Sequence, residues 1–174
     1  MERVDIDPVE PSPYETGVER RSLSDPLETD GVALNRYRLA TGERLSGLHA
    51  HPEQEEVFVV LAGEATFETL GWRVGERGAS DGGGPDAASE VVVESGGAIR
   101  FAPGEFQAGR NAGDSALVLL AIGAPRDGSD VRVPATCPEC GRGDTRPVSS
   151  DGEDALRCPD CGEVVTDPPP REEW

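Results

Sequence analysis

Four cysteines near the carboxyl end form two Cys-x-x-Cys pairs, a spacing that suits one metal ion. The pairs read CPECG and CPDCG, with seventeen residues between Cys140 and Cys158. Zinc prefers four ligands in a tetrahedron, and each pair presents two thiolates from one tight turn. The glycine after each second cysteine permits the left-handed backbone that such a turn favours. We therefore predict a structural Zn²⁺ site at Cys137, Cys140, Cys158 and Cys161.

Two alternatives to zinc are a pair of disulfides and a redox-active Cys-x-x-Cys. Disulfides suit a secreted chain, but the first residues, MERVDIDPVEP, lack the basic and apolar parts of a signal peptide. A redox motif needs a βαβ context, which the sequence does not suggest. The sequence also has no apolar run of membrane-spanning length. We therefore expect a cytoplasmic protein without a membrane partner.

The cysteine module resembles a zinc ribbon, with residues 146–148 and 155–157 as its expected hairpin. Such a small core implies that the metal supplies most of the folding free energy. Between Arg132 and Asp167 the chain has four arginines and eight acidic residues. This acidic balance disfavours nucleic acid as a partner, so a protein contact or plain stability is the expected role of the ribbon.

A second candidate metal site contains the only two histidines, His49 and His51, in GLHAHPEQEEVFVVLAGE. One intervening residue places both imidazoles on the same side of a strand. A carboxylate follows at Glu53, Glu55 or Glu56. Two histidines and one carboxylate suit Fe, Mn, Ni, Co or Zn, with open positions for a ligand. The alternative interpretation is a pair of exposed histidines in an acidic loop.

The segments that must position these histidines are short and apolar, and turn residues separate them. No segment shows a sustained helical period. This pattern predicts an all-β sandwich or barrel. The stretch 75–89 (GERGASDGGGPDAAS) is expected to be a glycine-rich loop at the tip of a hairpin. Strands are expected at 34–39, 57–61, 65–70, 90–93, 98–101 and 116–122.

The stretch HAHPEQEEVFVVLAG resembles the first motif of the cupin family, in which a glutamate and a glycine follow His-x-His. The stretch GGAIRFAPGEFQAGRN resembles the second motif, and the resemblance covers about residues 31–124. It implies a double-stranded β-helix, or jelly-roll barrel, with a metal inside the mouth of the barrel. It also implies that Glu56 is the metal-binding glutamate and that a homodimer through outer strands is to be expected.

The second motif departs from the family at its metal-binding histidine, where this chain has Gln107. The amide oxygen of glutamine is a neutral and weaker ligand than imidazole. The resemblance therefore implies a site of His49, His51 and Glu56, with Gln107 as the least certain fourth member.

The formal net charge is −18, and all sixteen basic residues are arginine. Such an acidic chain either stays largely disordered or folds in concentrated salt, where screening removes self-repulsion. The strand patterns favour the second interpretation, a halophilic type of protein. Since no basic face is evident, we do not expect nucleic acid as a partner.

Together these features predict an N-terminal arm with little structure of its own (1–30), a cupin barrel (31–124), a linker (125–133), a zinc ribbon (134–167) and a tail (168–174). The predicted function is a metal-binding cupin that holds a small molecule in its barrel, with the ribbon for a protein contact. The alternative is a metal-dependent cupin enzyme, an oxygenase or isomerase acting on a small organic substrate. The fold does not decide between them.

Overall fold

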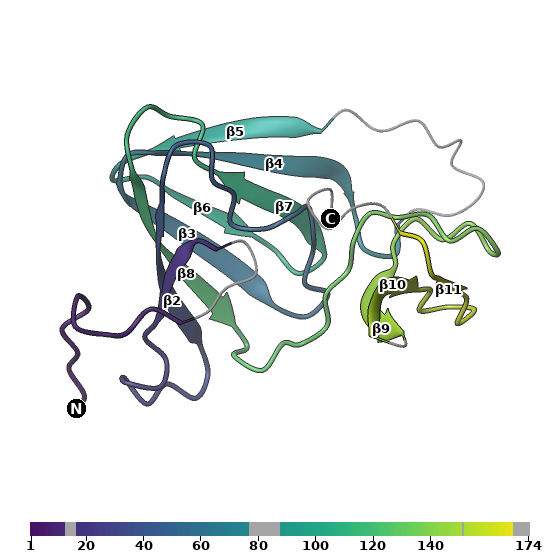
Figure 1. The fold of residues 1–174 in the computed structure, drawn as a ribbon, viewed down its shortest axis with the longest axis horizontal. Coiled ribbons are helices and arrows are strands. Elements are labelled where there is room, and N and C mark those ends of the chain that lie inside the picture. The colour runs from purple at the N-terminus through teal and green to yellow at the C-terminus, as the bar shows by residue number, and fades with distance from the viewer. Residues whose placement is uncertain (13–16, 77–87, 151, 169–174) are drawn as a thin grey trace.

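The computed structural model describes residues 1–12, 17–76, 88–150 and 152–168 (Figure 1). Most of the expected glycine-rich loop at 75–89 and nearly all of the expected tail lie outside the described residues. The described residues contain strands and no helix, so no helix long and apolar enough to cross a membrane is found among them.

Eight strands form the barrel as two facing sheets. The larger sheet has the order β1-β2-β8-β3-β6, and the smaller has the order β5-β4-β7. All pairings between neighbouring strands are antiparallel, as expected for a jelly roll. The strands are β1 Glu19–Ser22, β2 Ala33–Leu39, β3 Glu55–Ala62, β4 Glu64–Arg73, β5 Ser89–Glu94, β6 Ala98–Phe101, β7 Glu105–Arg110 and β8 Leu117–Ala124.

The N-terminal arm, expected to have little structure of its own, contains one strand, β1. β1 pairs with β2 from Glu19↔Arg38 to Ser22↔Asn35, which adds an edge to the larger sheet. The flanking Val18 and Leu23 are 3% and 2% exposed. Burial of these two apolar side chains stabilises a strand whose own residues are mostly charged.

The inward side chains of the larger sheet become smaller or more polar toward one end of the barrel. On β8, inward positions alternate with outward ones and run Leu117, Leu119, Ala121, Gly123. At the leucine end the core is closed by fully buried neighbours such as Leu39 and Val60. At the other end, a Cβ on Gly123 would meet the side chain of Gln54 at 2.8 Å, so the glycine makes room for this polar side chain. Gln54, Ala121 and Gly123 line the cavity at this end of the barrel, whereas the leucine end is filled.

Three motif residues of the barrel have clear backbone roles. Gly63 has φ of +79°, and a Cβ there would lie 2.7 Å from the carbonyl oxygen of Ala116, so only glycine fits. Gly104 also has a left-handed φ of +82°. Asn111 is 1% exposed and donates to the carbonyls of Leu39 and Ser115 at 3.1 and 2.8 Å. These residues maintain the turns that join the strands.

The cysteine module forms a separate three-stranded sheet beside the barrel, in the order β11-β10-β9 (Figure 1). Its strands are β9 Arg146–Ser150, β10 Glu153–Arg157 and β11 Val164–Val165. The expected hairpin is therefore present, and β11 adds a short third strand. Two isolated bridges connect it to the barrel, because Ala50 pairs with Arg132 and Val133 pairs with Thr145. The linker thus lies between the segment of the two histidines and the ribbon.

Candidate metal centre and ligand cavity

The two histidines lie in the segment that leads into β3, next to β7 of the opposite sheet. The backbone of His49 exchanges two hydrogen bonds with Gln107, at 3.1 and 2.8 Å. The rings of His49 and His51 are 5.0 Å apart and nearly perpendicular, so both lie on the same side of the segment, as the His-x-His spacing predicts.

The alternation of β3 distinguishes the candidate glutamates. Glu56, Phe58 and Val60 share the inward face, and Glu56 lies opposite Gly123 of β8. Glu55 points outward, where its carboxylate pairs with Arg100 at 2.6 Å. Glu53 is exposed and lies outside the cluster. The structure therefore brings together His49, His51 and Glu56, the set that the family resemblance implied.

The ligand atoms of these three residues all lie within 4.8 Å of one another. The Nε2 of His51 is 3.7 Å from the Oε2 of Glu56. Two atoms bound to one ion at 2.0–2.2 Å are separated by about 3 to 4.2 Å. The cluster is close to the size that one ion requires.

A hydrogen bond sets the ligating nitrogen of His49. Its Nδ1 lies 2.9 Å from the carbonyl oxygen of Gly47, which can only accept, so Nδ1 carries the proton and Nε2 carries the lone pair. Burial lowers the pKa of His49, the nearby Glu56 opposes this, and His51 lowers the pKa further. His49 is therefore held neutral with Nε2 available to a metal, the arrangement that a metal-binding histidine needs.

Gln107 occupies the remaining side of the cluster and is 3% exposed. Its Nε2 lies 2.9 Å from the Oε2 of Glu56 and 3.2 Å from the Nε2 of His49. Its Oε1 is buried without a hydrogen-bond partner. Rotation of the amide by half a turn exchanges the two atoms and places the oxygen toward the cluster. The donor set then becomes two imidazoles, a carboxylate and an amide oxygen, which fits a divalent ion.

A cavity of about 1110 Å³ extends from this cluster toward the open end of the barrel. Among the described residues, four buried polar side-chain atoms lack a hydrogen-bond partner, and three of them belong to residues that line this cavity. Such atoms are rare in folded proteins and point to a bound group that would satisfy them. The three are Arg44 Nε, His51 Nδ1 and Gln107 Oε1.

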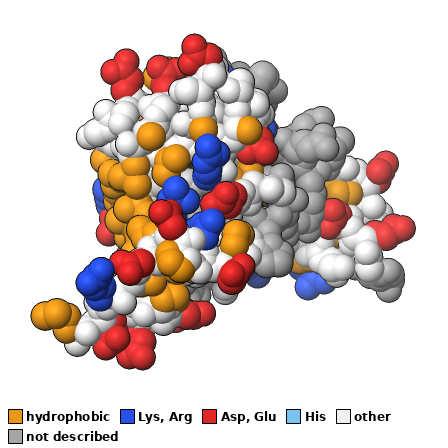
Figure 2. Space-filling model, turned by 60° about the vertical axis from the view of Figure 1, so that its left-hand side comes forward, with side chains coloured by type: hydrophobic (Ala, Val, Ile, Leu, Met, Phe, Trp, Pro, Cys, Tyr) orange, Lys and Arg blue, Asp and Glu red, His pale blue; other side chains and the backbone are white. Residues whose placement is uncertain are grey.

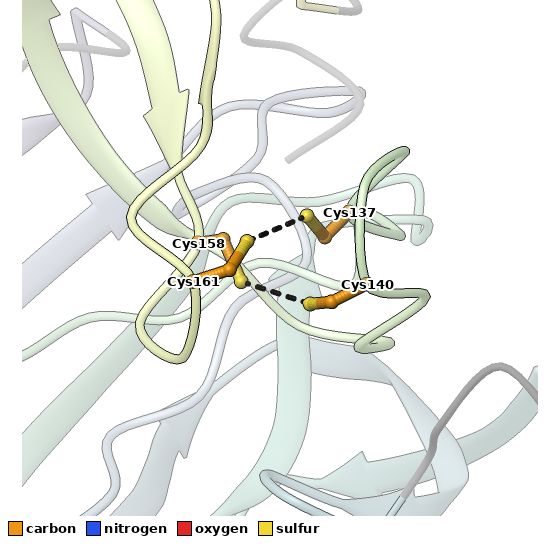
Figure 3. Close-up of side chains that lie close together, drawn as sticks. All are labelled: Cys137, Cys140, Cys158 and Cys161. Atoms are coloured by element: carbon orange, nitrogen blue, oxygen red, sulfur yellow. Dashed lines mark hydrogen bonds between the residues drawn. The ribbon is translucent and has the colours of Figure 1, made fainter.

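The four cysteines converge from two loops of the ribbon (Figure 3). The sulfurs of Cys137 and Cys161 are 3.6 Å apart, and those of Cys140 and Cys158 are 3.5 Å apart. Four thiolates at 2.3 Å from a tetrahedral zinc ion are about 3.8 Å apart, whereas disulfide sulfurs are about 2 Å apart. The distances therefore fit a closed Zn²⁺ site and exclude disulfides in this state.

The two cysteine loops have the same local geometry. Gly141 donates its N–H to the carbonyl of Cys137 at 2.9 Å, and Gly162 donates to Cys158 at 3.1 Å. Both glycines have a left-handed φ, of +75° and +79°. Because glycine adopts a left-handed φ without strain, it suits the position after each second cysteine.

A network of alternating charges joins the ribbon to the barrel, and no local sequence pattern indicates it. Asp144 is 0% exposed and accepts from the N–H of Gly75 after β4, from Arg132 of the linker and from Arg142 of the ribbon, at 2.9, 3.1 and 3.1 Å. The network continues to Asp160 through Arg142 and to Asp130 through Arg132.

Asp130 stands at the edge of the cavity between two arginines. It accepts from Nε and Nη2 of Arg132 at 3.0 and 2.7 Å, and from the same atoms of Arg146 at 2.9 and 2.8 Å. The hydrogen bonds from Arg132 lower the pKa of Asp130 to about 2, against the opposing effect of burial and with further help from Arg146. Asp130 is therefore charged at any ordinary pH.

Comparison with known proteins finds solved structures of similar fold. Among solved structures, the fold is similar to a protein assigned as a sugar phosphate isomerase from Acidithiobacillus ferrooxidans, with 20% identity, a TM-score of 0.57, and 81% of this chain and 76% of that chain covered. It is also similar to a predicted oxalate decarboxylase from Thermotoga maritima, with 21% identity, a TM-score of 0.55, and 71% and 98% covered.

At these identities the structural likeness concerns the fold alone. Among curated protein sequences, none matches this chain. The family model described as "Cupin domain" matches residues 35–123, which is about half of the chain and includes both histidines, Glu56 and Gln107. Residues 35–123 therefore place this chain in the cupin family.

Proposed function

We propose that this protein binds a divalent metal at His49, His51 and Glu56, with Gln107 as a fourth ligand, and holds a small organic molecule beside it in the barrel. The observation that carries the proposal is the convergence of the three ligand groups on a cavity large enough for such a molecule. The ribbon holds a structural Zn²⁺ through its four cysteines.

Enzymatic turnover is the second candidate, and the position of the cluster at the end of the cavity favours it. A divalent ion bound there would supply a Lewis acid to a ligand in the cavity. Glu56 and the neutral His49 would hold the ion, and Gln107 would lie beside the open coordination position. The apolar wall formed by Phe58 and Ala121 would limit access of water. The names of similar structures, which refer to oxalate and to sugar phosphates, support small organic anions as first compounds to test.

Three further features are proposals as well. The protein is proposed to be cytoplasmic. It is also proposed to be adapted to high salt, because its net charge is −18 and acidic side chains lie at many places on the face shown in Figure 2, with arginines among them. A homodimer through outer strands is proposed because the edge strand β5 exposes Val91 and Val92, which are 41% and 54% exposed. A protein contact through the ribbon is proposed in addition to its contact with the barrel.

The metal content of Glu56→Gln and Glu55→Gln tests the metal centre. The two residues are adjacent, but only Glu56 faces the cluster, so Glu55→Gln is a matched control. After dialysis against Mn²⁺ in concentrated KCl, the wild-type chain should carry one Zn²⁺ and one Mn²⁺. Loss of a direct ligand should weaken Mn²⁺ binding by at least about 100-fold in Glu56→Gln. Equal Mn²⁺ binding by both variants, or none by the wild type, would reject the proposed centre.

A further inference from the structure

We infer that the zinc ribbon forms part of the wall of the barrel's ligand cavity, and that Arg146 at the start of β9 binds the negative group of a small organic anion held there. The inference rests on the proposed metal centre and names the class of molecule that the cavity takes. It assigns the ribbon a role within its own chain.

The ribbon is joined to the histidine segment by backbone hydrogen bonds. Ala50, between the two histidines, exchanges hydrogen bonds with Arg132 of the linker at 2.8 and 2.9 Å. The next linker residue, Val133, exchanges hydrogen bonds with Thr145 at 2.9 and 3.0 Å. Arg146 follows Thr145 directly. The position of Arg146 relative to the metal centre is therefore set by two successive backbone pairings.

Residues after the barrel contribute a substantial part of the cavity wall. Asp130 and Val131 of the linker line it, and so do Arg146 and Pro147 of the ribbon. The other lining residues include inward residues of the barrel such as Asn35. The mouth of the cavity is thus formed by two parts of the chain.

Arg146 is held in one orientation by Asp130, which engages its Nε and Nη2. In the described part of the chain, its Nη1 has no partner among the side-chain hydrogen bonds. Guanidinium groups fixed in this way bind carboxylates and phosphates through paired N–H donors. The side chain is 47% exposed, so its ion pair contributes little to folding stability. Folding stability therefore does not explain an arginine at this position, and ligand binding is the role that we infer for it.

The charge around the cavity favours an anion. Among the described lining residues, Arg44 and Arg146 are basic and Glu56 and Asp130 are acidic, so their formal charges cancel. A divalent metal then leaves the cavity positive inside a chain whose net charge is −18. The Nε of Arg44 is also buried without a partner. Anionic ligands would satisfy these donors, whereas cationic ligands would be repelled by the metal.

The test measures binding of defined anions to the Mn²⁺-loaded full-length protein by calorimetry. The probes are oxalate, malonate, succinate and glutarate in one arm and glucose 6-phosphate in the other, so the arms distinguish carboxylates from phosphate esters. The probe with the highest affinity is then compared with a less charged counterpart. The counterpart is the half-amide for a dicarboxylate and glucose for glucose 6-phosphate. The variants are Arg146→Ala, Arg146→Lys and Arg157→Ala. Arg157 is the cross-strand partner of Arg146, is exposed and does not line the cavity, so it is the matched control.

Arg146→Ala should weaken binding of the tightest anion by about 10- to 100-fold. It should also abolish most of the preference for that anion over its less charged counterpart. Arg146→Lys should keep part of this preference, and Arg157→Ala should match the wild type. The preference is a readout that a purely structural role of Arg146 would not change.

Three results would overturn the inference: no binding of any probe by the Mn²⁺-loaded wild type, equal affinity in Arg146→Ala and wild type, or equal losses in Arg146→Ala and Arg157→Ala. Metal content is measured on the same samples. A wild type without Mn²⁺ would instead reject the proposed metal centre, so the two failures are distinguishable.

Discussion

Replacement of Asp144 by asparagine tests whether the barrel and the ribbon are held together by the buried charge network. Asp144 is 0% exposed, and its two oxygens receive three N–H donors from the barrel, the linker and the ribbon. Asparagine has almost the same shape but only one acceptor oxygen. With that oxygen kept toward Gly75 and Arg142, the new amide group faces Nη1 of Arg132, so two donors meet.

The expected cost follows from the burial of the partners. Removal of one member of a buried ion pair costs about 3 to 5 kcal/mol. Arg132 is 9% exposed but retains Asp130, so the cost should lie near the lower end, at about 3 kcal/mol. Asp160→Asn is the control, because Asp160 pairs with the same Arg142 but is 57% exposed. An exposed pair of this kind contributes less than about 1 kcal/mol.

The assay is urea unfolding in concentrated KCl with one probe for each part of the protein. In a Trp174→Phe background, fluorescence of Trp72, which is 9% exposed, reports on the barrel. Zinc release to a coloured chelator reports on the ribbon. With a urea m-value of about 1 to 3 kcal/mol/M, a loss of about 3 kcal/mol lowers the urea concentration at the unfolding midpoint by about 1 to 3 M. Both probes should shift in Asp144→Asn, because the carboxylate contacts both parts. A shift no larger than that of Asp160→Asn would refute the reasoning.

Three other predictions concern the metal centre, the barrel turns and the salt dependence. Gln107→His should raise Mn²⁺ affinity and Gln107→Leu should lower it, each by about tenfold or more in equilibrium dialysis, because the side chain contacts both His49 and Glu56. Asn111→Ala should destabilise the protein by about 3 kcal/mol in urea unfolding, since the buried carbonyl of Leu39 and the partly buried carbonyl of Ser115 lose their donor. A cost below about 1 kcal/mol would contradict this assignment. The melting temperature should rise between 0.1 and 2 M KCl, by about several degrees, because salt screens a net charge of −18; equal stability in dilute buffer would show that the charge does not limit folding.

The strands with alternating apolar residues could be predicted from the sequence, because one of their faces is buried and the other is not. The sequence does not predict β7, because its residues 106–109 are buried on both faces and show no alternation. Phe106 and Ala108 pack into a second apolar cluster with Trp72. Gly109 lies where a Cβ would meet Leu45 at 2.7 Å, which explains a glycine within a strand.

The candidate metal residues could be found from the sequence because their types and spacing are local. The choice between Glu55 and Glu56 could not be made from residue chemistry, since both carboxylates are equally suitable ligands. The family resemblance selected Glu56, and the pairing of β3 with β8 now supplies the physical reason, because it places Glu56 opposite Gly123 inside the barrel. Asp130, Asp144 and Arg146 had no local pattern, since their contacts depend on how the ribbon packs against the barrel.

The contact between the ribbon and the barrel determines which charged residues of the ribbon are paired and which are exposed. Arginines of the linker and the ribbon alternate with aspartates in the network at the junction, so these charges neutralise one another. The arginines are Arg132, Arg142 and Arg146, and the aspartates are Asp130, Asp144 and Asp160. The acidic residues that remain in this part of the chain are exposed where the structure describes them. An acidic outer face is well solvated in concentrated salt and repels phosphates. The arginines at this junction thus pair with aspartates of the linker and the ribbon, and Arg146 also lines the cavity.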